Sequence, residues 1–191
     1  MRWDELLWKL RLYKPDRYSE NDRTAFITQT VITGCEARGD RQSAYLSRYS
    51  LPRLGVFRAN LHIFHRSDNV EHHDHPWPFV TIILWRGYIE ETLCRRCKGD
   101  GKWFQWQAVL KKWISGPCPA CSGAGVCQKR VWPGSVLYRP ATWRHRVILP
   151  VEGKKAITIV IMGKRIREWG FFVEGGKRWQ LWTDYFRERG C

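Results

Sequence analysis

The sequence predicts a mainly β protein, an antiparallel barrel or jelly roll with short terminal helices. Apolar runs of strand length recur along most of the chain, and turn residues such as Pro133-Gly134 and Glu152-Gly153 separate them. Little of the sequence between these runs has helical periodicity. The 191 residues are 43% hydrophobic, so the chain is long and apolar enough to form one domain with a buried core.

The expected elements follow in chain order. Apolar residues recur at helical spacing over residues 3–13 and predict a short amphipathic helix there. Residues 182–189 are expected to form a closing helix. Strands are expected over residues 26–32, 44–49, 55–65, 78–88, 135–139, 145–149, 156–162 and 169–173.

One stretch interrupts this series of strands. Between Glu91 and Val131 the composition shifts to glycine, cysteine, lysine and tryptophan. Loops at the mouth of a barrel add length at small entropic cost. We therefore interpret residues 92–130 as an insertion between two strands of a single domain that spans residues 1–191.

The chain is strongly basic, with a formal net charge of +15. This charge favours anionic partners: a small anionic ligand, a nucleotide or nucleic acid. The basic residues are spread along the sequence rather than gathered in one block, so the alternative is a basic surface with no such partner. No apolar run approaches the ~20 residues that span a bilayer, and the N-terminus has no signal-peptide core. We expect a cytoplasmic protein with no membrane partner.

Five of the six histidines lie close together in the sequence, and the sixth is His145. Side chains two apart on a strand share a face, so His73 and His75 can point at one place while His72 and Asp74 point away. A third imidazole from a distant strand, that of His145, would complete a facial metal site inside a small barrel. Neutral nitrogen ligands suit Fe(II), Zn, Ni or Cu better than Mg or Ca. The alternative is that these histidines only form hydrogen bonds in the interior.

Turn residues flank the histidines at fixed spacings. The positions concerned are His73, His75 and Gly87 in the first stretch and Gly134, Pro140 and His145 in the second. Their spacing resembles the two motifs of the cupin superfamily, Gly-(5)-His-x-His-(3 or 4)-Glu-(6)-Gly and Gly-(5)-Pro-x-Gly-(2)-His-(3)-Asn. The resemblance covers roughly residues 44–175 and implies the cupin-type double-stranded β-helix, which is a jelly-roll barrel.

The chain departs from these motifs at four positions. Val80 stands where the family has its glutamate ligand, and Ser67 replaces the opening glycine of the first motif. Thr142 and Leu149 replace a glycine and the asparagine of the second motif. The missing glutamate leaves three imidazoles, a set that resembles the three-histidine iron site of the thiol dioxygenases. The resemblance thus implies a divalent transition metal, such as Fe(II), Ni or Zn, with positions open for a substrate.

Four blocks of sequence carry a finer resemblance. They are Arg-Ser-Asp at 66–68, His-Asp-His-Pro-Trp at 73–77, Trp-Arg-His-Arg at 143–146 and Arg-Glu-Trp-Gly-Phe at 167–171. Together they resemble a group of small cupin-like proteins of bacteria and their phages, most of which have no assigned activity. We expect Arg144, Arg146 and Tyr138 to contact a small anionic ligand at the barrel mouth. The arginines can equally pair with nearby carboxylates as a structural network.

Seven cysteines in a chain without a signal peptide indicate metal ligands before disulfides. Four of them form two copies of Cys-x-x-Cys-x-Gly-x-Gly, and twenty residues separate the two pairs. The four are Cys94, Cys97, Cys118 and Cys121. Two such knuckles supply four thiolates, the ligand set of a closed structural zinc site. The repeat resembles the cysteine-rich zinc module of J-domain chaperones, although no J-domain pattern accompanies it. The remaining cysteines, expected to be ordinary thiols, are Cys35, Cys127 and Cys191.

Three functions follow from these patterns. The leading one is a metal-binding cupin-fold protein that acts as a metal-dependent oxygenase-type enzyme on a small anionic substrate. The second is a non-catalytic module that binds a nucleotide in the barrel or nucleic acid on its basic surface. The third is a sugar-nucleotide epimerase or isomerase, since that chemistry also occurs on cupin folds and needs no metal. Tyr88, Glu90, Glu91 and Tyr138 are the nearby candidates for a general base. Cupins often dimerise, so the resemblance also implies a homodimer.

Overall fold

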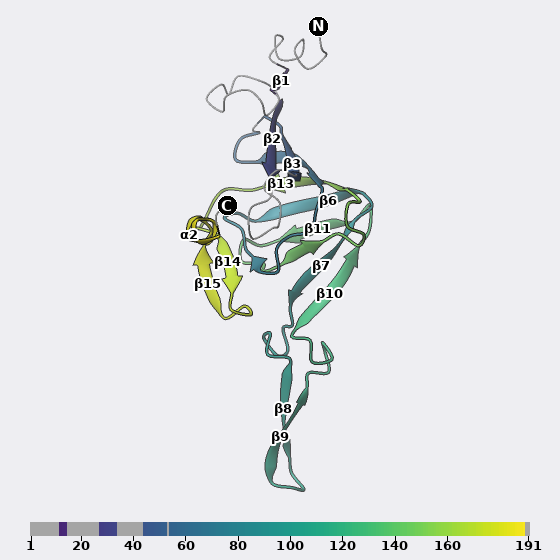
Figure 1. Cartoon of the computed structure of the whole chain (residues 1–191), viewed down its shortest axis with the longest axis vertical. Helices are drawn as coiled ribbons and strands as arrows, with labels where there is room; N and C mark the ends of the chain where they lie inside the picture. Colours follow the sequence, from purple (N-terminus) through teal and green to yellow (C-terminus); the bar gives the residue numbers. More distant parts are fainter. Residues whose placement is uncertain (1–11, 15–26, 34–43, 53, 190–191) are drawn as a thin grey trace.

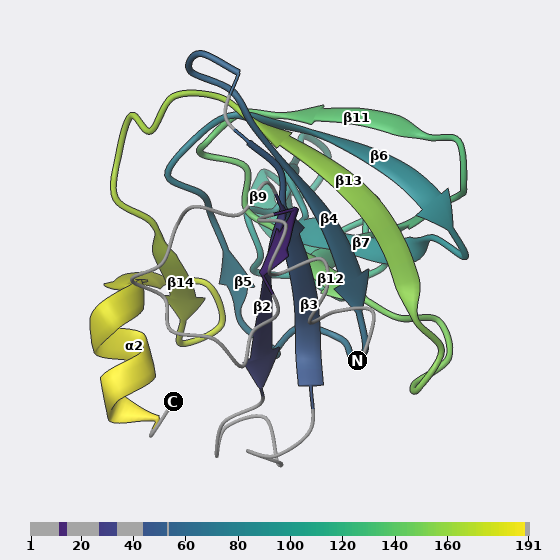
Figure 2. The same cartoon turned by 90° about the horizontal axis from the view of Figure 1, so that it is seen from above.

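The computed structural model describes residues 12–14, 27–33, 44–52 and 54–189, whose strands form two layers (Figures 1 and 2). The first layer is a seven-stranded sheet in the order β1-β2-β3-β4-β13-β6-β11. Its pairings are antiparallel except for that of β1 with β2. Its strands are β1 (Tyr13–Lys14), β2 (Ile27–Thr33), β3 (Ala44–Ser50), β4 (Arg58–Phe64), β6 (Phe79–Trp85), β11 (Val136–Arg139) and β13 (Ala156–Met162).

The second layer consists of two three-stranded sheets, β10-β7-β12 and β15-β14-β5. Its strands are β5 (His72–His73), β7 (Tyr88–Leu93), β10 (Val126–Val131), β12 (Arg146–Ile148), β14 (Gly170–Val173) and β15 (Arg178–Leu181). A bridge between His73 and His145 joins the two sheets, because each backbone N–H donates to the carbonyl oxygen of the other residue, at 2.9 and 3.1 Å. The second layer therefore runs β10-β7-β12-β5-β14-β15.

The strand order is that of a jelly roll. Eight strands alternate between the layers along the chain, in the orders β4-β13-β6-β11 and β5-β12-β7-β10, and only the β7–β10 hairpin stays within one layer. Two interlocked Greek keys give this arrangement. The expected fold class, mainly β with a jelly-roll architecture, is confirmed. The expected closure is wrong: among the described strands no ladder joins the two layers, so they form an open sandwich rather than a closed barrel.

Most of the expected strands lie within a few residues of their predicted bounds, and β13 has the same bounds. The strand expected over residues 78–88 is in fact two, β6 and the start of β7. Arg86 and Gly87 both adopt positive φ, 58° and 67°, and this turn takes the chain from the first layer to the second. Of the helix expected over residues 3–13, all but residues 12 and 13 lie outside the described part of the chain, and Tyr13 belongs to β1.

The hairpin β7–β10 carries a long extension away from the sandwich (Figure 1). The ladder runs from Tyr88 opposite Val131 to Leu93 opposite Val126. The chain therefore leaves the second layer at residue 94 and returns at residue 125, a narrower interval than the predicted 92–130. We call residues 94–125 the arm. Its outer part is a second hairpin, β8 (Lys102–Gln107) with β9 (Lys112–Pro117).

The core between the layers contains an apolar cluster and a cavity that have several residues in common. Alternate residues of β6 point inward, so Phe79, Thr81 and Ile83 are buried. The closing helix α2 (Trp182–Glu188) packs on β14 beside the cavity, where the rings of Phe171 and Tyr185 stack at 3.7 Å. The described residues contain no helix that is both long enough and apolar enough to span a membrane. The largest buried cluster comprises Leu46, Phe64, Ile83, Tyr88, Val131, Val147, Leu149 and Ala156.

Candidate metal centre in the cavity between the sheets

A cavity of about 430 Å³ lies between the two layers, and three histidines line it. His73 ends β5, His75 follows two residues later, and His145 directly precedes β12. The alternation of a strand gives the expected result: His73 and His75 face the cavity, whereas Asp74 is buried on the other side. The structure thus brings together the three imidazoles that the sequence motifs singled out.

The three imidazole rings form a nearly equilateral triangle. Their centroids lie 5.0 Å apart for His73–His75, 5.0 Å for His73–His145 and 5.1 Å for His75–His145. The Nε2 atoms of His75 and His145 are 2.9 Å apart. Two nitrogens at about 2.1 Å from one metal ion, and at right angles to each other, would be about 3.0 Å apart. One nitrogen from each of the three residues lies within 4.8 Å of the others, so the donor set fits a single ion bound on one face.

Glu90 orients one of these ligands. Its carboxylate accepts a hydrogen bond of 2.9 Å from Nδ1 of His145 and is also bound by Arg139 and by the indole N–H of Trp143. Burial raises the pKa of Glu90, but the hydrogen bonds from His145 and Arg139 outweigh it and bring the pKa to about 2. Because an ionised carboxylate only accepts, Nδ1 of His145 carries the proton and Nε2 presents its lone pair to the cavity. Carboxylate–histidine pairs of this kind commonly fix metal ligands.

His75 is in the form that binds a metal. Burial, followed by the charges of His73, His145 and His62, lowers the pKa of His75 well below its ordinary value. The ring is therefore neutral near pH 7, which is the charge state in which an imidazole binds a metal ion. It packs against the ring of Phe79 at a centroid distance of 4.4 Å.

No acidic side chain stands at position 80, where the cupin motif has its glutamate ligand. Phe79 and Thr81 line the cavity, whereas Val80, one residue off, does not. Among the described residues, no carboxylate joins the three imidazoles as a fourth ligand. A bound ion would consequently keep coordination positions for other molecules.

The expected ligand-binding residues Arg144, Arg146 and Tyr138 do not line this cavity. The guanidinium of Arg144 lies 4.0 Å above the ring of Phe172, and Tyr138 is 64% exposed on the outer face of β11. Arg146 pairs with Glu91 at 2.6 Å. The structural-network alternative therefore describes Arg146, because its charge is already balanced by a buried carboxylate.

The other histidines have separate environments. Nε2 of His65 lies 2.9 Å from the hydroxyl of Ser47, and His72 lies 3.5 Å from Glu91. His62 on β4 lines the cavity opposite the three ligands.

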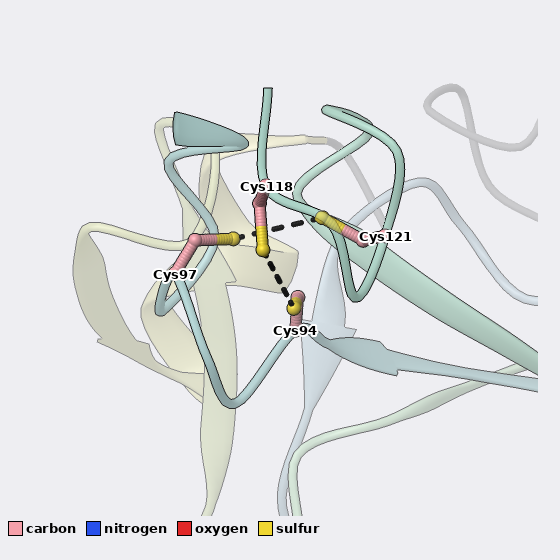
Figure 3. A group of neighbouring side chains, drawn as sticks. All are labelled: Cys94, Cys97, Cys118 and Cys121. Atoms are coloured by element: carbon pink, nitrogen blue, oxygen red, sulfur yellow. Dashed lines mark hydrogen bonds between the residues drawn. The ribbon is translucent and has the colours of Figure 1, made fainter. Parts of the chain in front are cut away.

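The four paired cysteines converge at the base of the arm (Figure 3). Sγ of Cys94 lies 3.9 Å from Sγ of Cys118, and Sγ of Cys97 lies 3.7 Å from Sγ of Cys121. In a tetrahedral zinc site with Zn–S bonds of about 2.3 Å, the sulfurs are about 3.8 Å apart. These two separations match a tetrahedral zinc site, and all four sulfurs lie within 4.8 Å of one another.

The glycines of the two cysteine repeats hold the knuckles together. A Cβ on Gly101 would lie 2.2 Å from the carbonyl oxygen of Gly123, and one on Gly125 would lie 2.3 Å from that of Gly99. The two repeats thus interlock through backbone contacts that no larger residue allows. The amide of Gly125 donates to Sγ of Cys121 at 3.3 Å, as amides do to metal-bound thiolates.

Of the cysteines expected to be ordinary thiols, Cys127 is the one inside the described residues. It lies beside the four-cysteine cluster without joining it. Cys35 and Cys191 lie outside the described part of the chain.

No protein-family model matches the sequence, and no curated protein matches it either. Solved structures match it in part. A cupin domain from Bordetella pertussis Tohama I is 14% identical, with 61% of this chain and 91% of that chain covered and a TM-score of 0.37. KdgF from Halomonas sp. is 15% identical, with 63% and 81% covered and a TM-score of 0.37. Hydroxypropylphosphonic acid epoxidase from S. wedmorenis is 8% identical, with 70% and 55% covered and a TM-score of 0.41. At this level of similarity the jelly-roll assignment depends on the strand order described above.

Proposed function

We propose that this protein is a cupin-type metal-dependent enzyme that converts a small anionic molecule in the cavity between its sheets. The observation that carries the proposal is the convergence of His73, His75 and His145 on one cavity of about 430 Å³. Cavities of this size hold small molecules and exclude polymers. We further propose that Cys94, Cys97, Cys118 and Cys121 bind a structural zinc.

The chain's own residues prepare this site in two ways. Glu90 holds the His145 ring in one tautomer and one orientation, so this ligand needs no reorganisation. Three aromatic rings line the cavity next to the imidazoles and make their surroundings apolar. They belong to Phe79, Trp169 and Phe171. A bound metal such as Fe(II) would supply Lewis-acid or redox chemistry at the positions that the protein leaves free.

None of the four residues that the sequence suggested as a general base is free to act as one. Burial raises the pKa of Tyr88, so its hydroxyl stays protonated. Glu90 is bound by His145 and Arg139, and Glu91 is bound by Arg146. Tyr138 is exposed away from the cavity. This arrangement favours chemistry that a metal initiates, and an oxygenase-type reaction is our choice within that class.

Nitric oxide binding tests whether the centre has open positions. Protein that holds one equivalent of zinc, bound by the four thiolates, and is then loaded with one equivalent of Fe(II) is expected to give a high-spin iron–nitrosyl signal in electron paramagnetic resonance, because three imidazoles leave free positions on the ion. The His73→Ala, His145→Ala double variant is expected to give none. If the loaded wild type showed no such signal, the proposal would be contradicted, and the His145–Glu90 pair would become an acid–base candidate for an epimerase-like reaction.

The arm supports nucleic-acid binding as a second candidate function. Phe104, Trp106 and Trp113 are 59%, 48% and 66% exposed, and Trp106 lies opposite Trp113 across the hairpin with ring centroids 5.8 Å apart. The arm has six basic side chains, all exposed, against one acidic residue. Exposed aromatic rings among cationic side chains are the surface on which single-stranded nucleic acid stacks.

A single-stranded oligonucleotide tests this second candidate. We expect the Trp106→Ala, Trp113→Ala variant to bind a fluorescent oligonucleotide at least about tenfold more weakly than wild type, since each stacked base contributes about 1–3 kcal/mol. Lys111→Ala with Lys112→Ala should weaken binding and reduce its salt dependence. The matched control is Trp132→Ala, which removes a 63% exposed tryptophan outside the arm. If anisotropy titrations gave the arm variant and this control the same affinity for the oligonucleotide, binding through the arm would be ruled out.

A further inference from the structure

Three polar side chains lie side by side on the inner face of the first layer. Arg48 on β3 is directly opposite His62 on β4, and His62 is directly opposite Thr158 on β13. All three line the cavity that His73, His75 and His145 line from the second layer. The inner face of a jelly roll is normally apolar, so a row of three polar side chains at this place needs an explanation.

Each of the three has a buried polar atom with no hydrogen-bond partner: Nε of Arg48, Nε2 of His62 and Oγ1 of Thr158. Thr158 is fully buried. Burial lowers the pKa of Arg48, and burial together with the charge of Arg48 lowers the pKa of His62 to about 3, so His62 is neutral. A buried charge without a partner destabilises the folded state, and buried polar groups that lack a partner are uncommon.

The carboxylates around the cavity do not balance Arg48. Asp68 binds the hydroxyl of Tyr45 and the backbone N–H of Val147. Glu71 accepts a hydrogen bond of 2.8 Å from the hydroxyl of Tyr185. Among the described residues, no carboxylate forms an ion pair with Arg48.

We propose that Arg48, His62 and Thr158 form an oxyanion-binding subsite, which holds the carboxylate or phosphate group of a ligand whose other end reaches the three histidines. The inference rests on the proposed function and specifies its substrate class. A guanidinium presents two parallel N–H donors to an oxyanion, and the threonine hydroxyl and the neutral imidazole can each donate one more hydrogen bond. Facing sheets are about 10 Å apart, so one small molecule can bridge the subsite and the metal centre.

Arg48→Met tests the subsite, because methionine keeps most of the side chain's length and removes the charge. Without an anion, we expect this variant to be at least as stable to heat as wild type, since it removes a charge that has no carboxylate partner among the described residues. A structural role for Arg48 predicts the opposite, a loss of stability. The matched control is Arg165→Met, which removes the same charge from an exposed surface pair with Glu168.

Inorganic phosphate and malonate are the probes, measured by calorimetric titration and thermal denaturation at constant ionic strength. Both should bind wild type and the Arg165→Met control, and binding to Arg48→Met should be at least about tenfold weaker, as expected for losing charge-assisted hydrogen bonds. The anion with the larger effect identifies the ligand as phosphate-like or carboxylate-like. If neither probe bound wild type, Arg48, His62 and Thr158 would bind only water, and the proposal would be overturned. Equal binding to Arg48→Met and wild type would also overturn it, because the anions would then be on the basic surface.

The His73→Ala, His145→Ala variant separates this inference from the proposed function. It is expected to retain anion binding, because the subsite belongs to the other layer. Retained anion binding in a wild-type protein that binds no cavity metal would contradict only the proposed enzyme. If the cavity bound a metal but Arg48→Met bound the anions as tightly as wild type, only the subsite would be contradicted.

Discussion

Replacing Cys94 and Cys118 by serine is expected to release the zinc and unfold the arm while the jelly roll keeps its fold. The arm has little apolar interior of its own apart from the cluster around the cysteines. Zinc binding contributes about 10–16 kcal/mol to the folding of small zinc modules, far more than a hairpin of this length supplies. The ladder from Tyr88–Val131 to Leu93–Val126 is outside the arm and should persist.

Three measurements check this result. Metal analysis should show one zinc fewer per chain, limited proteolysis should cut within residues 94–125, and the main thermal transition should remain. Cys127→Ser is the control, because Cys127 is next to the cluster but outside it. An arm that stays protease-resistant after the zinc is lost would show that the hairpin folds without the metal.

Replacing His73 and His145 by alanine is expected to abolish metal binding in the cavity without unfolding the protein. The variant removes two of three ligands, whereas the bridge between these residues uses backbone atoms that alanine retains. Glu90→Gln provides a graded comparison. It leaves all three imidazoles but removes the charge that orients His145, so affinity should fall about 10–100-fold, the usual effect of changing a ligand's supporting residue.

Titration with Ni(II) of protein that holds one equivalent of zinc, bound by the four thiolates, measures both effects. His65→Ala is the matched control, since His65 binds Ser47 and does not line the cavity. We expect affinity to decrease in the order wild type and His65→Ala, then Glu90→Gln, then the double histidine variant. If Glu90→Gln had the Ni(II) affinity of wild type, the role of Glu90 would be contradicted. If the double histidine variant had that affinity, the metal centre would be contradicted.

Local spacing in the sequence was sufficient to predict the four clustered cysteines and two of the three clustered histidines. Two-residue periodicity places His73 and His75 on one face of a strand, and the repeated Cys-x-x-Cys-x-Gly-x-Gly pattern pairs the cysteines. His145 required the resemblance to a family motif, because it is 70 residues from His75 and only the sheet pairing brings it close.

The residues that support the centre could not be assigned from spacing. Glu90 is 55 residues from His145, and its contact with Nδ1 depends on the pairing of β7 with β12. Arg48 and His62 are neighbours through the register of β3 with β4, and a one-residue shift would turn them outward. His62 is two residues from the apolar Phe64 on β4, and this spacing predicts that His62 points inward. The spacing does not reveal which residues of the other layer face His62.

Charge in the sequence did not indicate which arginine lines the cavity. Arg146 was expected to bind an anionic ligand, and instead it neutralises the buried Glu91. Arg48 had no distinguishing motif and is the arginine that faces the cavity without a carboxylate partner among the described residues. Which arginine is available depends on the buried acids around it, and that is a property of the fold.

The most direct test of the three-histidine centre is the number of metal ions per chain after saturation and removal of excess metal. Protein dialysed anaerobically against zinc and then Fe(II) should retain two ions: one zinc bound by the four cysteines and one ion lost in the His73→Ala, His145→Ala variant. One ion per chain in wild type, lost on Cys94→Ser with Cys118→Ser and unaffected by the histidine changes, would contradict the metal centre in the cavity.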